Sequence, residues 1–338
     1  MKTVFHITST NTFSGAEKIA IEIIQKTQSL FNNYYICKPG PIEQVLIEKN
    51  INYITFTNKW ELLKEIKANK PDILHCHDYT ASILGALTHV KVVFSHIHNN
   101  TPFAKTLNLK SFMYFLSSFK YKKIICVSKA ISDEMFFYSQ LKKKIQIVYN
   151  WVNSDERKWE PEEDRDIDLL FVGRFTEQKN PMLFIKIVEE LKKSQPFINA
   201  LMIGEGDLKE EIQCYVIKEN LSSYITIKDF TETPHQYMKK AKIFLLTSTW
   251  EGFGLVILEA MLNGAIVISK PIGGAKEIIV NQKNGFLCED EYQFVKVIKN
   301  VLNNPNNYDN VKKSGISTMQ DFDIDLQIKM IIDLYQQY

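Results

Sequence analysis

Two successive series of short apolar runs, separated by longer amphipathic stretches, constrain the fold of this chain more than any other feature. The runs are rich in Ile, Val, Phe and Tyr and have the length of buried strands, whereas the stretches between them carry apolar residues at helical spacing. Alternation of strand and helix is typical of parallel sheets that are covered by helices. The sequence therefore predicts an α/β protein made of two doubly wound, Rossmann-like domains that face a central cleft.

The predicted elements fall into a first and a second series. The strands of the first series are expected near 3–8, 34–37, 73–75, 91–96, 124–127 and 145–149, with helices near 16–30, 59–69, 79–88 and 128–139. The strands of the second series are expected near 167–172, 199–203, 225–228, 243–247 and 266–269, with helices near 180–194, 207–219, 254–262 and 290–303. Ligands of such sheets bind beyond the carboxyl ends of the strands, so the residues that follow each strand are the functional candidates.

A polar stretch at 150–166 separates the two series. It is rich in charged residues, contains Pro161 and has almost no aliphatic side chains, which is typical of a linker. We therefore expect an N-terminal domain over 1–155 and a C-terminal domain over 156–318. A last amphipathic segment, 319–338, is expected to form a helix that packs back toward the N-terminal domain.

Composition and charge exclude several classes of protein. The chain has 338 residues, and 41 Lys and Arg against 39 Asp and Glu give a formal net charge of only +2, which provides no general attraction for nucleic acid. The five cysteines are widely spaced and form no Cys-x-x-Cys pair, so neither a disulfide framework nor a zinc site is indicated. There is no signal-peptide pattern and no apolar run long enough to span a bilayer, so we expect a cytoplasmic protein.

One region is strongly basic. Residues 105–144 contain nine lysines and only two acidic residues. Within it, the segment 105–123 interleaves lysines with aromatic residues. This pattern fits either a core helix with a lysine face or an interfacial helix that contacts an anionic lipid surface. The second interpretation predicts peripheral binding to the inner face of the cell membrane.

The segment 247–261 is the most informative for chemistry. It follows an apolar strand, turns through Gly252 and Gly254, and enters a helix, where free backbone N–H groups suit a phosphate or sugar oxygen. Glu251 lies in the turn and Glu259 lies in the helix, so both side chains are candidates to border one ligand. The alternative is an ordinary strand-to-helix turn, with one exposed glutamate and one that complements the helix dipole.

A second candidate segment, 170–181, also follows a buried strand. It ends in Gly173, which allows close approach of the backbone, and two cations follow, Arg174 and Lys179. A guanidinium and an ammonium group after a strand suit a diphosphate. The chain has only three arginines, and the other two lie in the expected linker.

The first series offers weaker signals. Its first turn contains a single glycine, Gly15, before a helix, and lacks the Gly-x-Gly-x-x-Gly fingerprint of dinucleotide-binding proteins, which disfavours a nicotinamide oxidoreductase. His96 and His98 share one face at the end of a strand, but no third ligand at a metal-binding spacing is evident. Metal sites in the His75–Asp78 segment and in the two Asp-x-Asp patterns, Asp164-Arg165-Asp166 and Asp321-Phe322-Asp323, are also disfavoured.

Taken together, these motifs resemble those of the family-4 retaining glycosyltransferases, the group 1 class with the GT-B fold. The resemblance covers nearly the whole chain, and its most specific parts are the two glutamates and the Gly-Arg…Lys segment. The matching residues, in chain order, are Ser14-Gly15-Ala16-Glu17, Ile124-Ile125-Cys126-Val127-Ser128, Val148-Tyr149-Asn150, Phe171-Val172-Gly173-Arg174, Lys179-Asn180, Gly204-Glu205-Gly206, Glu251, Glu259, Gly273-Gly274-Ala275-Lys276-Glu277 and Asn284-Gly285-Phe286.

The resemblance implies a role for each candidate residue. In the C-terminal domain, Glu259 would bind the ribose of a nucleotide sugar, Arg174 and Lys179 its diphosphate, and Glu251 its sugar. The backbone of the turn made by Gly252, Phe253, Gly254 and Leu255 would assist Glu251. In the N-terminal domain, which the resemblance implies to bind the acceptor, Gly15 would approach the diphosphate. His98 would act beside the anomeric centre, with His96 as the alternative histidine.

The resemblance also implies the activity and the partners. The enzyme would transfer a hexose-type sugar, with retention of configuration, from a nucleotide sugar to a saccharide or lipid-linked saccharide in bacterial surface polysaccharide or glycolipid synthesis. A UDP-sugar is the expected donor, and neither a cofactor nor a metal ion is expected to take part. Two alternatives stay open: a catalytically silent subunit of this fold that binds a partner glycosyltransferase, and a nucleotide-sugar epimerase or hydrolase. The sequence identifies neither the sugar, nor the acceptor, nor the linkage.

Overall fold

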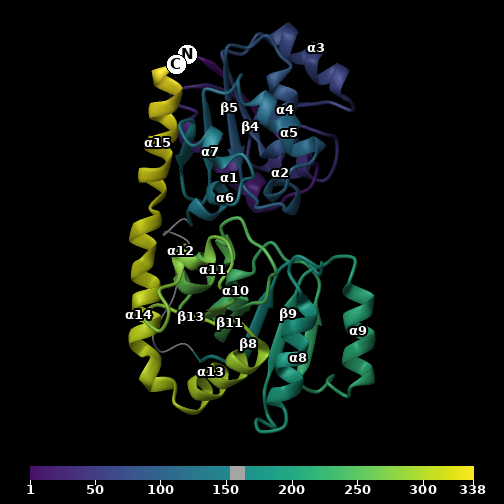
Figure 1. Cartoon of the computed structure of the whole chain (residues 1–338). Coiled ribbons are helices and arrows are strands. Elements are labelled where there is room, and N and C mark those ends of the chain that lie inside the picture. The colour runs from purple at the N-terminus through teal and green to yellow at the C-terminus, as the bar shows by residue number, and fades with distance from the viewer. Residues whose placement is uncertain (153–163) are drawn as a thin grey trace. The chain divides into compact units, whose positions relative to one another are not determined.

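The computed structural model describes residues 1–152 and 164–338, and the chain divides into two compact units (Figure 1). Unit 1 consists of Met1–Asn150 together with Ile324–Tyr338, and unit 2 consists of Trp151–Asp323. The boundary thus lies after Asn150, whereas the sequence placed it after residue 155. Most of the expected linker, 153–163, lies outside the described residues.

Unit 1 is built on a sheet of seven parallel strands in the order β3-β2-β1-β4-β5-β6-β7. Its strands are β1 (Thr3–Ile7), β2 (Asn32–Cys37), β3 (Tyr53–Thr55), β4 (Ile73–His77), β5 (Val92–Ile97), β6 (Lys123–Cys126) and β7 (Ile145–Ile147). Its helices are α1 (Gly15–Thr27), α2 (Ile42–Glu48), α3 (Lys59–Asn69), α4 (Asp78–Ala86), α5 (Leu109–Ser117), α6 (Lys129–Asp133), α7 (Tyr138–Leu141) and α15 (Ile324–Gln337), with the 3₁₀ helix η1 (Pro102–Lys105).

Unit 2 is built on a sheet of six parallel strands in the order β10-β9-β8-β11-β12-β13. Its strands are β8 (Ile167–Val172), β9 (Ala200–Ile203), β10 (Ile225–Lys228), β11 (Ala241–Leu246), β12 (Ile266–Ser269) and β13 (Phe286–Leu287). Its helices are α8 (Pro181–Leu191), α9 (Lys209–Lys218), α10 (His235–Met238), α11 (Leu255–Leu262), α12 (Ala275–Ile278), α13 (Glu291–Asn303) and α14 (Asp309–Ser317), with the 3₁₀ helices η3 (Pro305–Tyr308) and η4 (Thr318–Phe322).

Both sheets have the doubly wound order, so each has a point at which the chain reverses its direction of travel across the sheet. That switch point lies between β1 and β4 in unit 1 and between β8 and β11 in unit 2. Ligands of open α/β sheets bind at the carboxyl ends of the strands on either side of the switch point. The two switch points are therefore where a site is to be sought.

The last helix, α15, belongs to unit 1. The ring of Tyr335 is completely buried and packs edge-on against Phe31, and its backbone carbonyl accepts a hydrogen bond of 3.0 Å from Lys2 Nζ. At the other end of the helix, Gln327 Oε1 accepts a 3.0 Å bond from the backbone N–H of Tyr149. The helix thus adds a buried aromatic residue to the core of unit 1.

Residues at both ends of the expected linker are packed or hydrogen-bonded within the folded protein. Trp151 is fully buried, and Arg165 donates hydrogen bonds to the carbonyls of Ala241 (2.5 Å) and Asn263 (2.8 Å), so this guanidinium fixes backbone in unit 2. Asp168, which follows the first Asp-x-Asp pattern, pairs with Lys242 Nζ at 2.7 Å. Asp168 is therefore engaged in an ion pair within unit 2.

Helix α5 packs one side against the interior of unit 1 and exposes the other. Tyr114 is buried on one side of the helix, but Leu109, Phe112, Met113 and Leu116 are exposed. Among the described residues, no helix combines the length and the apolar character that crossing a bilayer requires.

Candidate active site

An ion pair lies at the switch point of unit 2, where the loops after β8 and β11 meet. Lys179 Nζ lies 2.5 Å from Glu251 Oε1, and their side chains are only 18% and 7% exposed. The two residues are far apart in sequence, and each follows one of the two strands that flank the switch point. The structure therefore brings together two of the residues that the sequence singled out separately.

The turn that carries Glu251 is fixed from several sides. Ser248 Oγ donates a 2.6 Å hydrogen bond to Glu251 Oε1, the same oxygen that Lys179 contacts. Gly273 has φ +44°, and a Cβ placed there would lie 1.9 Å from the carbonyl oxygen of Glu251. A Cβ at Gly274 would lie 2.4 Å from the carbonyl oxygen of Phe253. These two glycines are thus needed because the backbone of the glutamate turn lies directly against them.

The helix α11 begins immediately after this turn. Gly254, at its N-cap, has φ +93°, a left-handed conformation that favours glycine. Leu255 is the first residue of the helix, and Glu259 lies farther along it and is half-buried. Backbone N–H groups in the first turn of a helix lack intrahelical partners and attract negative charge. The turn and the helix start therefore offer both a carboxylate and backbone donors.

The loop after β8 carries the predicted arginine. Arg174 is exposed, and its Nη2 donates to Gln178 Oε1 at 3.4 Å, while Gln178 Nε2 donates to the carbonyl of Trp250 at 3.1 Å. Gln178 thus connects the loop of Arg174 to the loop of Glu251. A Cβ at Gly173 would make only an ordinary contact of 3.6 Å with the stem of Lys179, so packing within the protein does not demand a glycine there.

A cavity of about 400 Å³ lies at the carboxyl ends of β9 and β10. Phe230, whose ring is largely exposed, and Tyr237 provide aromatic surface, and Asp229 and Thr231 provide polar groups. This volume is within the range of small-molecule sites. The sequence did not single out the segment 229–231, because it carries no motif of its own.

The switch point of unit 1 holds the other predicted residues. Gly15 is the first residue of α1, and Glu17, which is nearly fully buried, accepts hydrogen bonds from the hydroxyls of Ser14 and Thr10. The carboxylate of Glu17 therefore ties the loop after β1 to the first turn of helix α1. Asp78, at the end of β4, has φ +72°, and its Oδ1 accepts the backbone N–H of His98 at 3.1 Å.

The structure separates the two candidate histidines. His96 lies within β5 and is completely buried, whereas His98 follows the strand and is 8% exposed. Their rings share one face of the sheet, as predicted, with centroids 4.1 Å apart. His98 Nε2 lies 2.9 Å from His77 Nδ1, and His96 Nδ1 lies 3.0 Å from His75 Nε2. Of the two, His98 stands at the strand end, where ligands bind.

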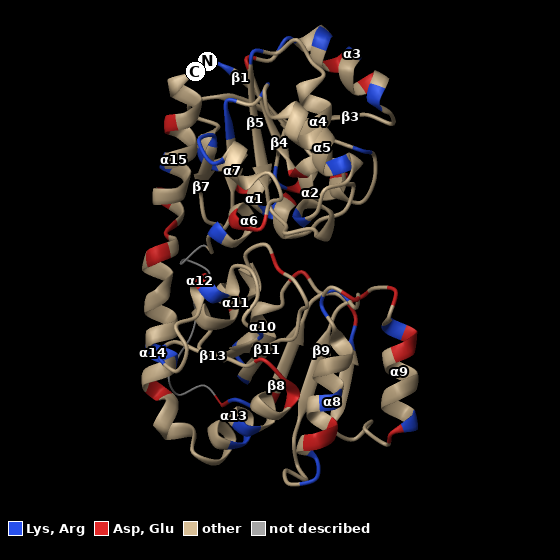
Figure 2. Cartoon of the chain, viewed as in Figure 1, with Lys and Arg blue, Asp and Glu red and all other residues tan. Residues whose placement is uncertain are grey.

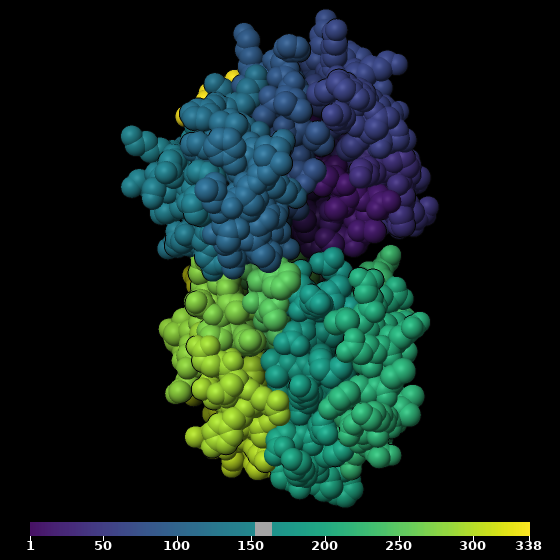
Figure 3. Space-filling model, turned by 45° about the vertical axis from the view of Figure 1, so that its right-hand side comes forward, coloured from purple at the N-terminus to yellow at the C-terminus, as the bar shows by residue number. Residues whose placement is uncertain are grey.

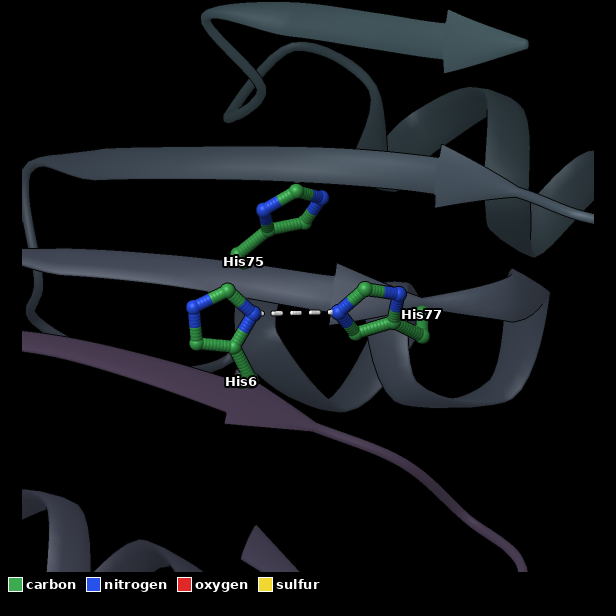
Figure 4. A group of neighbouring side chains, drawn as sticks. All are labelled: His6, His75 and His77. Atoms are coloured by element: carbon green, nitrogen blue, oxygen red, sulfur yellow. Dashed lines mark hydrogen bonds between the residues drawn. The ribbon is translucent and has the colours of Figure 1, made fainter. Parts of the chain in front are cut away.

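Three further histidines complete a buried cluster that the sequence did not reveal. His6, His75 and His77 lie side by side on β1 and β4 (Figure 4), with His6 and His75 in register. His77 also lies beside His96 and His98, and so provides the third histidine that the sequence failed to show near that pair. Alternation along strands was visible in the sequence, but the register between strands was not.

The donor set of this cluster is one that transition metals accept. In each of two groups, His6-His75-His77 and His77-His96-His98, three ring nitrogens lie within 4.8 Å of one another. Imidazole suits zinc, copper and nickel. In this structure several of these nitrogens instead hydrogen-bond to one another.

Burial keeps the cluster neutral. Desolvation lowers the pKa of His6 and of His98 to about 3, and lowers the pKa values of His75, His77 and His96 well below the usual range. The carboxyl of Asp78 is also desolvated, which raises its pKa to about 6. Near neutral pH, the switch point of unit 1 therefore holds five uncharged imidazoles.

Comparison with known proteins places both units in one group. Residues 152–318 match the family "Glycosyl transferases group 1", and residues 29–156 match "Glycosyltransferase Family 4". The chain is 30% identical over 249 residues to an uncharacterized glycosyltransferase of Methanocaldococcus jannaschii, a match that covers 71% of this chain and 67% of the relative.

A longer match concerns a relative of stated activity. Over 329 residues, 94% of this chain and 90% of the relative, the chain is 25% identical to a Campylobacter jejuni protein named GalNAc-alpha-(1->4)-GalNAc-alpha-(1->3)-diNAcBac-PP-undecaprenol alpha-1,4-N-acetyl-D-galactosaminyltransferase. Among solved structures, Anabaena HepE in complex with UDP and glucose superposes with a TM-score of 0.89 at 17% identity, and the match covers 100% of both chains. That likeness confirms the predicted GT-B fold class.

Proposed function

This chain belongs to the group 1, family-4 type glycosyltransferases, and from that premise we propose that it transfers a hexose-type sugar from a nucleotide sugar to a saccharide or lipid-linked saccharide. We propose further that the transfer retains the anomeric configuration and that the donor is a UDP-sugar. The observation that carries the proposal is the Lys179–Glu251 ion pair at the switch point of unit 2. Such a pair offers a cation to a diphosphate and a carboxylate to a sugar.

We assign the donor to unit 2. Arg174 and Lys179 bind the diphosphate, because an exposed guanidinium and an ammonium group follow the same strand. Glu251 binds the transferred sugar together with the backbone from Gly252 to Leu255. Glu259 on α11 binds the ribose hydroxyls. Each of these roles is one that the family resemblance implies.

The cavity beside β9 and β10 suits the base of the nucleotide. The exposed ring of Phe230 is a stacking surface for a planar base, and Asp229 and Thr231 provide polar groups for its edge. Gly204 connects this cavity to the diphosphate residues, because a Cβ there would lie 1.9 Å from the carbonyl oxygen of Gly173. We propose that one nucleotide extends from this cavity to Arg174 and Lys179. Support for UDP comes from HepE, whose structure contains it.

The chemical task is to stabilise a departing diphosphate and a sugar that develops positive charge. Fixed charges perform this task when they are oriented before the reaction and shielded from water. Arg174 and Lys179 provide positive charge for the leaving group, so we expect the reaction to need neither a metal ion nor a cofactor. From the family resemblance alone, we further propose that Gly15 of unit 1 contacts the diphosphate and that His98 acts at the anomeric centre.

The acceptor is proposed from the relatives. The Campylobacter jejuni relative acts, by its name, on an undecaprenol-diphosphate-linked saccharide. We propose an acceptor of the same chemical class, a saccharide on a lipid diphosphate, in bacterial surface polysaccharide or glycolipid synthesis. Such an acceptor lies at a membrane, and the protein would meet it on the inner face of the cell membrane.

The surface of unit 1 around α5 supports peripheral membrane binding. Leu109, Phe112, Leu116 and Phe119 are exposed apolar residues, and the segment 105–144 contains nine lysines. Figure 2 colours the lysines of unit 1 blue, among them those near α5. Figure 3 shows blue to teal side chains from this part of the chain standing out from unit 1. Apolar side chains that enter the interface, flanked by lysines that attract anionic lipids, are the two components of interfacial binding. We name this surface, residues 105–123, the α5 surface.

Release of UDP tests the proposal and separates its alternatives. The protein is incubated with UDP-glucose, UDP-galactose or UDP-N-acetylglucosamine, with and without a saccharide linked to a lipid diphosphate. We expect UDP release that depends on the acceptor, and a product whose anomeric proton coupling shows retention. Release without acceptor would instead indicate a hydrolase, and conversion of the donor without release would indicate an epimerase. If neither these donors nor the corresponding GDP- and ADP-sugars, tested in the same way, are consumed, the proposal is wrong and the silent-subunit alternative is favoured.

A further inference from the structure

A chain of hydrogen bonds runs through unit 1 from Asn33 to His98. Asn33 Oδ1 lies 3.3 Å from His6 Nε2, and His6 Nδ1 lies 3.3 Å from His77 Nε2. His77 Nδ1 in turn lies 2.9 Å from His98 Nε2. The chain ends at His98 Nδ1, which is buried and has no hydrogen-bond partner within the described residues. Each neutral imidazole in it has one N–H group and one lone pair.

The orientation of Asn33 fixes the direction of every bond in this chain. Asn33 Nδ2 donates to the carbonyl oxygen of Phe31 at 3.3 Å and to Thr27 Oγ1 at 3.1 Å. A carbonyl oxygen only accepts, so the amide nitrogen must face Phe31 and the amide oxygen must face His6. His6 therefore carries its proton on Nε2, where it donates to Asn33, and its Nδ1 is a lone pair.

The same reasoning applies to the next two histidines in this series of hydrogen bonds. The lone pair of His6 Nδ1 accepts from His77 Nε2–H, and the lone pair of His77 Nδ1 accepts from His98 Nε2–H. His98 Nδ1 is then left with a lone pair. The reversed order would place the lone pair of His6 Nε2 against Asn33 Oδ1 at 3.3 Å, with two acceptors facing each other in a buried site. Burial also keeps the rings neutral, since it lowers the pKa values of His6 and His98 to about 3.

We propose that Asn33, His6 and His77 are positioning residues that hold His98 in the tautomer with an unprotonated Nδ1, so that His98 presents a hydrogen-bond acceptor to a hydroxyl group of a sugar substrate. The use of this acceptor rests on the proposed function, whereas the tautomer rests on the geometry alone. A hydroxyl is the matching ligand, because it donates where a phosphate oxygen or a carbonyl does not. The hydrogen bonds from Asn33 to His98 thus determine that His98 Nδ1 binds a hydrogen-bond donor and not an acceptor.

A second chain of histidines provides an internal comparison. It runs from the hydroxyl of Tyr335 to His75 Nδ1, and from His75 Nε2 to His96 Nδ1 at 3.0 Å. His96 Nε2 has no partner among the described residues. A hydroxyl both donates and accepts, so Tyr335 does not impose a direction on this chain. The two chains therefore differ in one respect, the group at which they begin.

Nitrogen NMR of the imidazole rings tests the proposal without an activity assay. The whole protein is labelled with ¹⁵N-histidine, and long-range proton–nitrogen spectra distinguish protonated from unprotonated ring nitrogens for each of its seven histidines. In the wild type we expect His98 to show an unprotonated Nδ1 and a protonated Nε2. A wild-type spectrum with a protonated Nδ1 on His98 would overturn the proposal, and this measurement needs no variant.

A variant at Asn33 then tests whether this residue determines the tautomer of His98. Asn33→Leu removes the acceptor, and we expect a mixture of His98 tautomers. Asn32→Leu is the matched control, because Asn32 is the exposed neighbour on the same strand. Tyr335→Phe alters the second chain and should leave His98 unchanged. A single unchanged tautomer in Asn33→Leu would overturn the proposal.

Turnover links the tautomer to the reaction. We expect Asn33→Leu to lower kcat for sugar transfer by about two- to tenfold with little change in the Kd of UDP, since one net hydrogen bond sets the preference. Mixed tautomers with unchanged kcat would contradict the role toward a hydroxyl. Stoichiometric zinc, copper or nickel in the purified protein would overturn the hydrogen-bond chain itself. If the protein transfers no sugar, the proposed function fails, but the spectra still decide the tautomer.

Discussion

The switch points of the two sheets show two different ways to keep polar side chains in a protein interior. In unit 2, Lys179 and Glu251 are paired as ions. In unit 1, five histidines are held neutral, and several of them hydrogen-bond to one another. Both solutions occupy the same topological place, the carboxyl ends of the strands beside the reversal of the sheet.

The difference between the two sites indicates which chemical task each of them is suited to. Buried charges stabilise charge on a ligand, because little solvent intervenes, and so the site of unit 2 suits a diphosphate. Neutral imidazoles attract no diphosphate, but they direct hydrogen bonds and distinguish donors from acceptors. We therefore propose that unit 2 stabilises charge on the ligand and that unit 1 orients hydroxyl groups.

The largest effect is expected from breaking the ion pair. Lys179→Met leaves the carboxylate of Glu251 buried without its cation, so the free energy of unfolding should fall by about 3–5 kcal/mol. The double variant Lys179→Met, Glu251→Leu should regain most of this stability, because no charge is left unpaired. Sugar transfer should fall by about 10²–10³-fold in both. Urea unfolding and UDP release measure the two effects, and a double variant that is as unstable as the single one would contradict the comparison.

Acid should destabilise the protein through the neutral cluster. The unfolded histidines bind protons below pH 6.5, whereas His6 and His98 resist protonation down to about pH 3, so the free energy of unfolding falls as the pH falls below 6.5. The expected slope is about 1.4 kcal/mol per pH unit for each histidine. Asp78, whose pKa is raised to about 6, acts in the opposite direction below that pH.

Urea unfolding at pH 7 and pH 5 measures this dependence. His6→Gln should reduce the difference between the two pH values by about 2 kcal/mol, which is the contribution of one histidine over that range. His235→Gln, at a histidine of unit 2 outside the cluster, is the comparison variant. Equal pH dependence in the wild type and in His6→Gln would show that the cluster does not control acid stability.

We expect the lysines of the α5 surface in unit 1, and not those of unit 2, to bind anionic phospholipid. Changing Lys120, Lys122 and Lys123 to Glu should weaken binding to vesicles of anionic phospholipid by about a hundredfold or more, since each basic residue near such a surface contributes about 1 kcal/mol. Sedimentation with the vesicles measures the partition. The matched control changes Lys296, Lys299 and Lys313 of unit 2 to Glu, and should have little effect. Equal losses in both variants would remove the α5 surface as the binding site.

An effect no larger than that of His6→Gln is expected at the glycines that support the glutamate turn. Gly273→Ala places a Cβ 1.9 Å from the carbonyl oxygen of Glu251 at a left-handed φ, so we expect a loss of about 2 kcal/mol in stability. Transfer activity should also fall, because the turn must move. Gly173→Ala, whose Cβ would make an ordinary 3.6 Å contact, should cost less than about 1 kcal/mol. A Gly273→Ala variant as stable as Gly173→Ala would mean that the turn adapts freely.

Much of the fold could be predicted because strand and helix periods are local. The strands at 73–75 and 167–172 and the helix at 290–303 lie close to where the sequence placed them. The strands β3 and β13 were missed, since three and two residues show no periodicity. The helix expected at 128–139 is two short ones, α6 and α7.

The candidate site was predictable residue by residue but not as a constellation. Arg174, Lys179, Glu251 and Glu259 follow strands, and the sequence shows that much. Which side chains meet depends on the packing of loops, and so the Lys179–Glu251 pair appears only in the structure. The histidine cluster depends likewise on strand register, which places His6 opposite His75.

Binding of a nucleotide sugar to unit 2 is the central claim, and thermal unfolding with a panel of UDP-, GDP- and ADP-sugars tests it most directly. A ligand that binds only the folded protein raises the Tm by mass action. We predict that one class of donor, the UDP-sugars, raises the Tm of the wild type, and that Glu259→Ala and Lys179→Met both lose the shift. No shift with any donor, in the presence as well as the absence of a lipid-linked acceptor, would contradict the account.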